Sequence, residues 1–259
     1  MSTATPGSHS RAVPDLDASA KTNAAWHARF SRDEIQDLLA VESWRGLVSV
    51  ATNWAIIASV FAGVALWPHP LTAVAALFLI GARQLGLAVL MHEASHRTLL
   101  ADKRWNDAVG NWLCAYPVWS DLHAYRPYHL QHHAKTWTKD DPDIGLVLPF
   151  PITPASLRRK VWRDLSGQTG RKFVRGAWKR SIARWRAGDE DGRRAFVGFL
   201  ATNGVLFALL AALGHPLLYL LWAGAWLTTN TLVTRIRSIA EHAMVPDPSD
   251  PLRNTRTTL

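Results

Sequence analysis

The chain has 259 residues, of which 48% are hydrophobic and 13 are Trp, enough for one sizeable domain or several membrane spans. Its formal net charge is +9, but the basic residues gather beside apolar segments rather than in a nucleic-acid module, so we exclude nucleic acid and favour anionic lipid as the partner. Cys114 is the only cysteine, which excludes an intrachain disulfide and any site built from several cysteines.

The N-terminal region is polar and precedes a short helix. Residues 1–20 lack the apolar core of a signal peptide, so we assign residues 1–30 to a disordered tail and residues 31–259 to one membrane domain. The sequence Ser31-Arg32-Asp33-Glu34 fits a capping box. It predicts a helix that leads into the first apolar segment.

Four apolar segments follow in two pairs. Residues 46–67 carry no charge and are long enough to cross a hydrocarbon core of about 30 Å. Residues 71–91 carry only Arg83, and residues 195–213 and 216–234 form the second pair. We therefore predict an all-α, polytopic membrane protein with four transmembrane helices in two hairpins.

The distribution of Lys and Arg predicts the orientation of these spans. Five of the 29 basic residues lie in residues 1–45, nineteen in 97–194 and four in 235–259, and both hairpin tips lack charged residues. Because loops with excess positive charge face the cytoplasm, we expect a multi-pass protein with cytoplasmic N- and C-termini. The central region then forms a helical cap on the cytoplasmic side.

Two segments of the central region lie at the membrane in this interpretation. Residues 109–119 are apolar but too short to span, which indicates a re-entrant piece whose Trp112 and Tyr116 either line a lipid tunnel or belong to the aromatic belt. Residues 171–187 predict an amphipathic helix in the membrane interface, with a solvated loop helix as the alternative.

Arg83, inside a span, either packs with a polar partner or faces the substrate.

Histidines occur in three groups that the predicted topology brings to one membrane face. The first group lies in "MHEASHRTLL" at i and i+4, the second in "YRPYHLQHHAKTW" at i, i+3 and i+4, and the third in "RSIAEHAMV" after the last span. The spacings within the first two groups place their imidazoles on one side of a helix. The candidate metal ligands are His92, His96, His129, His132, His133 and His242.

The first group fits two kinds of metal site. His92-Glu93-Ala94-Ser95-His96 matches the HExxH of zinc proteases, where Glu93 would be the general base, and also a looser HxxxH pattern. A catalytic zinc takes three protein ligands and a water. Six imidazoles without cysteine better suit two iron ions that bind and activate dioxygen, and zinc remains the lesser alternative.

These motifs together resemble the membrane fatty-acid desaturase superfamily, which also contains hydroxylases, carotenoid ketolases and alkane monooxygenases. The resemblance covers the chain from about residue 31 and rests on the first box, on HLQHH followed by "TKDDPDIG", and on "RSIAEHA". It implies that the five histidines of the first two boxes ligate two non-haem irons and that O2 is a co-substrate. His242 matches a further ligand of several members.

One feature of that pattern is missing from the sequence. The family has a third box, HxxHH, beyond the segment that corresponds to "DPLRNTRTTL", whereas no histidine follows His242 before Leu259. We interpret the sequence as a fragment of a longer protein. The alternative from another class is a catalytically silent membrane fragment with an incomplete metal site.

Carboxylates beside the histidines are candidates for orienting them. A carboxylate that accepts the second ring N–H of a ligating histidine holds it in the metal-binding tautomer, although the Asp-Pro cluster is also a simple turn signal. The candidates are Glu93, Asp140, Asp141, Asp143 and Glu241. The remaining histidines are interpreted as polar surface or structural residues: His9, His27, His69, His123 and His215.

The expected reaction is O2-dependent desaturation of a lipid acyl chain, with hydroxylation or ketone formation on the same scaffold as alternatives. The chain has no cysteine set for an iron–sulfur cluster and no Gly-rich dinucleotide turn. Electrons must therefore come from an external ferredoxin-like or cytochrome-like donor. We expect this donor to dock on the basic cytoplasmic face.

Overall fold

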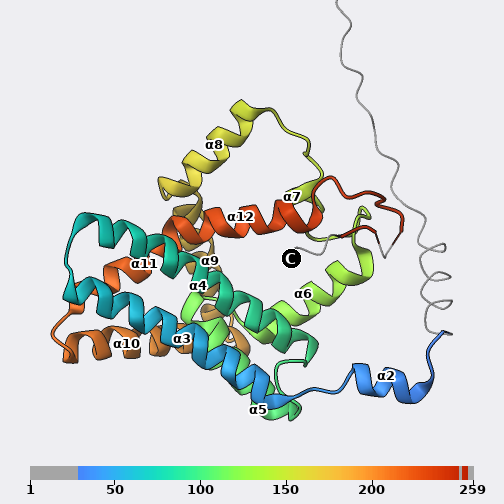
Figure 1. Cartoon of the computed structure of the whole chain (residues 1–259), viewed down its shortest axis with the longest axis horizontal. Helices are drawn as coiled ribbons and strands as arrows, with labels where there is room; N and C mark the ends of the chain where they lie inside the picture. Colours follow the sequence, from blue (N-terminus) through green and yellow to red (C-terminus); the bar gives the residue numbers. More distant parts are fainter. Residues whose placement is uncertain (1–28, 251–252, 256–259) are drawn as a thin grey trace, which may run out of the picture.

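The computed structural model describes residues 29–250 and 253–255, and every regular element within them is a helix. Figure 1 shows the helices gathered into one body, with α12 running beside α4. The predicted all-α class is confirmed for this part of the chain. Most of the predicted N-terminal tail lies outside the described residues.

The described chain begins with the predicted capping box. The Ser31 backbone N–H donates to the Glu34 carboxylate at 2.8 Å, and the Glu34 backbone N–H donates to the Ser31 hydroxyl at 3.2 Å. These two bonds satisfy donors that the first turn of a helix leaves unpaired. The short helix α2 (Arg32–Leu38) starts here, as predicted, and α3 (Ser43–Leu66) follows it.

Helices α3 and α4 (Pro70–His96) form the first predicted hairpin. Ile57, Ile80 and Leu87 are almost fully buried between them and the neighbouring helices. The Asn53 side-chain amide donates to the Arg83 backbone carbonyl at 3.1 Å. Burial of these apolar side chains holds the pair together, and α4 continues past the predicted span to the first histidine group.

The predicted re-entrant segment, residues 109–119, is helical over most of its length. A short helix α5 (Lys103–Val109) continues into a π-helix (Gly110–Ala115) and a 3₁₀ turn (Tyr116–Val118). Gly110 lies so close to α4 that a Cβ there would meet the Ala94 methyl at 2.6 Å. The close approach packs this segment against the end of α4, just before α6 (Leu122–Lys135) begins.

The second half of the chain consists of further helices that cover α4 and α6. The predicted interfacial helix is α9, and its Trp178 contacts the rings of Trp119 and Phe196 while remaining half exposed. Part of its aromatic face therefore packs on α10. The bounds are α7 (Ile144–Val147), α8 (Pro154–Leu165), α9 (Gln168–Arg186), α10 (Glu190–Ala212), a 3₁₀ turn (Pro216–Leu218), α11 (Tyr219–Leu227) and α12 (Thr229–His242).

Three helical stretches of the described residues are long and apolar enough to cross a membrane: Arg32–Leu66, Pro70–His96 and Glu190–Ala212. The segment predicted as the fourth span, residues 216–234, is divided between α11 and α12, because the backbone at Thr228 leaves helical geometry with φ −123° and ψ −85°. The break coincides with a short polar run, Thr228-Thr229-Asn230-Thr231, which the prediction of one span over residues 216–234 did not take into account.

Two glycines from other helices press on that break. A Cβ on Gly170 of α9 would lie 2.2 Å from the Leu227 carbonyl oxygen, and a Cβ on Gly81 of α4 would lie 2.3 Å from the Thr229 hydroxyl. The absence of side chains at both positions lets α9 and α4 approach the backbone of the break from two directions. Helix α12 then leads from the break to His242, beside the end of α6.

Candidate metal centre

Helix α4 carries the first histidine pair on its last turns. His92 and His96 share one face, with their ring centroids 4.8 Å apart. The helix ends at Arg97, whose φ of +63° is left-handed and stops further helical bonding. The last carbonyls of α4 are therefore left for other partners.

Arg126 of α6 supplies those partners and joins the two helices. Its guanidinium donates at 3.0 Å to the carbonyls of Ala94 and Ser95, and it is paired with the carboxylate of Asp107. Asn106 also donates to the Ala94 carbonyl at 2.9 Å. Since Arg126 lies one turn before His129, these bonds fix the second histidine group relative to the first.

Four imidazoles meet at this junction. His92, His96, His129 and His133 each offer one ring nitrogen, and the four nitrogens lie within 4.8 Å of one another. The Nε2 atom of His129 is 2.9 Å from the Nε2 atoms of both His96 and His133. Two imidazole nitrogens bound to one ion at about 2.1 Å and at right angles lie about 3.0 Å apart, so these distances suit a single metal ion.

Desolvation and mutual repulsion lower the pKa of two members of this four-histidine cluster, His129 and His133. Burial, followed by the neighbouring imidazoles of His92 and His133, lowers the pKa of His129 to about 3. Burial, followed by His96 and His132, lowers the pKa of His133 to about 4. Both rings are neutral at pH 7, which is the form that donates a lone pair to a metal.

Two members of this four-histidine cluster have orienting partners. His92 Nδ1 lies 3.0 Å from the carboxylate of Glu93, which also accepts from the Thr98 hydroxyl at 3.0 Å. His129 Nδ1 lies 3.2 Å from the Tyr125 hydroxyl, and the two rings are stacked at 5.0 Å. The prediction for Glu93 as an orienting group gains support, whereas Tyr125 was missed, although its position four residues before His129 was a usable signal.

His132 and His242 form a pair beside the four-histidine cluster. Their ring centroids are 5.0 Å apart, and the His132 ring is 5.7 Å from that of His133. The Nδ1 atom of His242 is buried and has no hydrogen-bond partner among the described residues. An unpaired buried nitrogen is costly, and a metal ligated there would satisfy it.

The Asp141 carboxylate orients His132. It lies 2.7 Å from His132 Nδ1 and also accepts from the backbone N–H groups of Trp137 and Asp143, at 3.0 and 2.8 Å. Burial opposes protonation of His132, but the bond to Asp141 outweighs it and raises the pKa of the imidazole. With Nδ1 held by the carboxylate, Nε2 remains for a ligand.

The histidines open into one cavity of about 360 Å³ between α4, α6 and α12. His92, His129, His132, His133 and His242 all line it. Two further residues on its wall, Arg237 and Glu241, are bonded to each other at 2.8 Å. The three sequence groups therefore do converge, as two adjoining sets of four and two imidazoles.

Several other predicted site residues have different surroundings. Asp140 is exposed, and its backbone contacts the side chains of Gln131 and Thr138. Asp143 accepts from the Tyr128 hydroxyl and lies 3.8 Å from His132 Nδ1. Glu241 binds Arg237. Three residues proposed to line the substrate path, and one surface histidine, do not line the histidine cavity: Arg83, Trp112, Tyr116 and His123.

Trp112 instead lines an apolar groove with Trp54 and residues of α10. Tyr116 is buried, with its ring edge-to-face on Trp112 at 5.2 Å, and it packs against Gly198. This groove lies on the side of α3 and α10. In the structure these two aromatic residues serve helix packing.

Three helices of the described residues are of membrane-spanning length, and one of them, α4, joins α6 in a four-histidine cluster that could hold a metal ion. The fatty acid desaturase family model matches residues 65–259, which include all six histidines. The chain belongs to the fatty acid desaturase family.

A curated relative agrees with this assignment. The "Dihydrorhizobitoxine desaturase" of Bradyrhizobium elkanii is 26% identical over 231 residues, which cover 83% of this chain. They cover 64% of the relative, so the chain spans slightly less than two thirds of that protein's length.

Proposed function

We propose that the chain forms the di-iron core of an O2-dependent desaturase that removes two hydrogens from neighbouring carbons of a lipid acyl chain. The observation that supports this most directly is the convergence of four imidazoles, with Nε2–Nε2 distances of 2.9 Å at His129, beside the His132–His242 pair. Neutral imidazoles without cysteine suit iron in oxygen chemistry.

In this proposal the four-histidine cluster holds one iron and the His132–His242 pair contributes to the second. The irons would supply the activation of dioxygen that removal of hydrogen from an unactivated carbon requires. The residues of the chain present neutral nitrogens and fix ring orientation through Glu93, Tyr125 and Asp141. Overall, the acyl chain loses two hydrogens, and O2 with two electrons and two protons becomes two water molecules.

The electrons come from an external ferredoxin-like or cytochrome-like donor that docks on the cytoplasmic face. The nineteen basic residues between residues 97 and 194 support an acidic partner there. We propose the corresponding topology as well: α11 with the first turns of α12 completes a fourth crossing, and the histidines and both termini lie on the cytoplasmic side.

Metal content and product analysis test the proposal together. The protein is expressed with its full natural sequence in membranes, and iron per chain is measured alongside the fatty-acid products of a lipid extract. We expect bound iron and an alkene product, both lost in His96→Ala. Bound zinc with peptide hydrolysis that disappears in Glu93→Gln would overturn the proposal, and an alcohol or ketone product would replace desaturation by the corresponding oxidation.

A further inference from the structure

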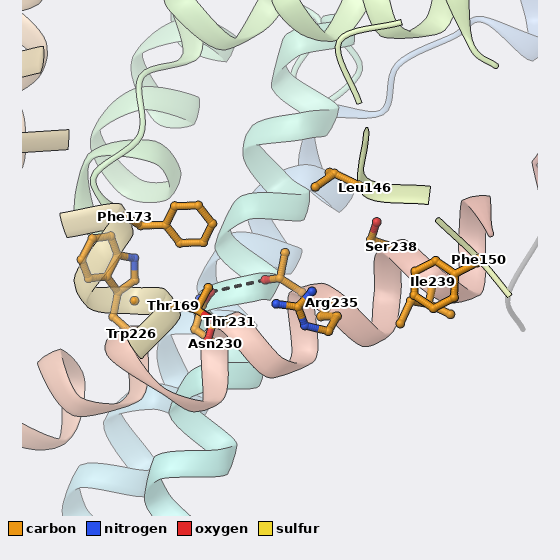
Figure 2. Close-up of a pocket in the computed structure, with 12 residues that line it drawn as sticks. Leu146, Phe150, Thr169, Phe173, Trp226, Asn230, Thr231, Arg235, Ser238 and Ile239 are labelled. Carbon is orange, nitrogen blue, oxygen red and sulfur yellow. Dashed lines mark hydrogen bonds between the residues drawn. The ribbon is translucent and has the colours of Figure 1, made fainter. Parts of the chain in front are cut away.

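A second cavity of about 270 Å³ adjoins the histidine cavity and is drawn in Figure 2. It lies between α9, α12 and the segment around α7. Leu146, Thr234 and Ser238 line both cavities, so the two spaces share one wall. We call this second space the side cavity, and its shared residues place it directly beside the histidine cavity.

The walls of the side cavity differ in chemistry. One wall is apolar and includes Leu146, Phe150, Phe173 and Trp226. The α12 wall presents hydrogen-bonding groups at intervals of four residues, namely the amide of Asn230 and the hydroxyls of Thr234 and Ser238. These three residues lie on the stretch of α12 that ends at His242, as the backbone in Figure 2 shows for Asn230 and Ser238.

Two of these polar groups have bonding capacity to spare. Among the described residues, the Ser238 hydroxyl has no hydrogen-bond partner, and the Asn230 side chain only accepts from the Thr234 hydroxyl, at 3.3 Å. Each side-chain amide has two donors, and each hydroxyl can both donate and accept. A plain hydrocarbon chain would leave these groups without a partner.

The two arginines that line these cavities are already paired with carboxylates. Arg235 donates to the buried Asp164 carboxylate, whose Oδ1 atom is 2.8 Å from the guanidinium and also accepts from Thr169 at 2.6 Å. Arg237 is paired with Glu241 in the histidine cavity. The described lining therefore offers no free guanidinium to bind a carboxylate, so the wall favours an uncharged polar group.

The distance from the histidines to these polar groups follows from helix geometry. Ser238 and Thr234 lie one and two helical turns before His242, or about 6 and 12 Å along the axis.

We propose that the substrate is an aliphatic chain that reaches from the histidine cavity into the side cavity. It bears an uncharged hydroxyl or amide group about 6–12 Å from the oxidised carbon, with Asn230, Thr234 and Ser238 as its specificity-determining residues. The inference rests on the proposed function and names its substrate class. The apolar wall receives the carbon skeleton, and α12 binds the polar group.

Binding to the metal-free protein in detergent tests this separately from the chemistry. The probes are decanamide and n-decane, with palmitate as the plain long chain. We compare wild type with Thr234→Val, Ser238→Ala and a triple variant that adds Asn230→Leu. Each lost hydrogen bond should weaken decanamide binding about 2- to 10-fold, while n-decane binding stays unchanged. Micelle partition is the same for all variants and cancels.

Two matched variants complete the design. Ile236→Ala alters an exposed residue of α12 outside the side cavity and should change neither probe, whereas Phe173→Ala should weaken both. Wild type that prefers palmitate, or decanamide binding that is unaffected by the triple variant, would overturn the inference. Because no metal is bound in this assay, either result leaves the test of the iron proposal intact.

Discussion

The four-histidine cluster and the His132–His242 pair reach the same cavity by different structural routes. The cluster is made by α4 and α6 alone, from residues within 92–133, and Arg126 bonds the two helices together beside it. The pair joins α6 to α12, and within residues 29–250 and 253–255 no side-chain hydrogen bond links these two helices as Arg126 links α4 and α6. His242 instead retains an unpaired buried nitrogen.

This difference indicates that the two groups are preorganised to different degrees. The cluster has its nitrogens at ligand-like distances already, so a metal would need little rearrangement there. The pair depends on the direction of α12, which is set at Thr228 by the approach of α4 and α9. We expect the cluster to be the tighter site and the pair to be the one that α12 controls.

Removal of His129 should have the largest effect on metal binding. Its Nε2 atom contacts those of both His96 and His133, so His129→Ala should abolish binding at the cluster and reduce oxidation to background. Metal per chain, measured by mass spectrometry on detergent-purified protein, reports the loss. His123→Ala changes an exposed histidine of the same helix and serves as the control. Retention of the tighter metal in His129→Ala would show that the cluster is not a site.

Removal of His242 should separate the two groups. In His242→Ala the cluster is untouched, so the tighter metal stays while the weaker one is lost, and oxidation that needs both ions ends. Titration of the purified protein with Fe(II) under anaerobic conditions distinguishes one step from two. His215→Ala, far along the sequence from every ligand, should titrate like wild type. Two unchanged steps in His242→Ala would remove this residue from the ligand set.

Asp141→Asn should have a smaller effect that is confined to the pair. The amide keeps the shape of the buried side chain but removes the charge that holds His132 in one tautomer. Loss of such an orienting partner typically costs 10- to 100-fold in metal affinity. The same Fe(II) titration should show only the weaker step moved. Asp140→Asn, at the exposed neighbour, is the matched control, and an equal shift there would contradict an orienting role for Asp141.

The elements and residues that sequence could predict are those whose signals are local. The capping box at Ser31, the hairpin of α3 and α4, and the histidine spacings on α4 and α6 all follow from helical periodicity and ligand chemistry. Each of these needs only a few consecutive turns of chain. The predicted groups therefore match the structure closely in this part of the molecule.

The remaining features depend on contacts between distant segments. The break at Thr228 begins a polar run, but the close approach of Gly81 and Gly170 from two other helices to its backbone has no local sequence signal. Arg126 had no local signal, because it bonds backbone carbonyls of α4 and the carboxylate of Asp107, which lies 19 residues away in the sequence. For Trp112 and Tyr116 the choice between a lipid tunnel and the aromatic belt stayed open, because aromatic composition alone does not say which helix a ring faces.

Tyr125→Phe should give the smallest change, because it removes a single oxygen atom beside the four-histidine cluster. The variant keeps the ring that stacks on His129 and removes only the hydroxyl 3.2 Å from Nδ1. Burial, with smaller contributions from nearby charges, raises the pKa of this phenol to about 12, so the hydroxyl is neutral at assay pH and is a weaker orienting partner than a carboxylate. We expect a loss in metal affinity of about 10-fold, at the lower end of such effects, and only in the tighter step.

Tyr128→Phe removes a hydroxyl that donates to Asp143 beside His132, so it should instead move the weaker step. Cobalt(II) provides the readout, since its visible absorption bands report the geometry of each site. If both variants shift the same step, the four-histidine cluster and the His132–His242 pair are one coupled site rather than two.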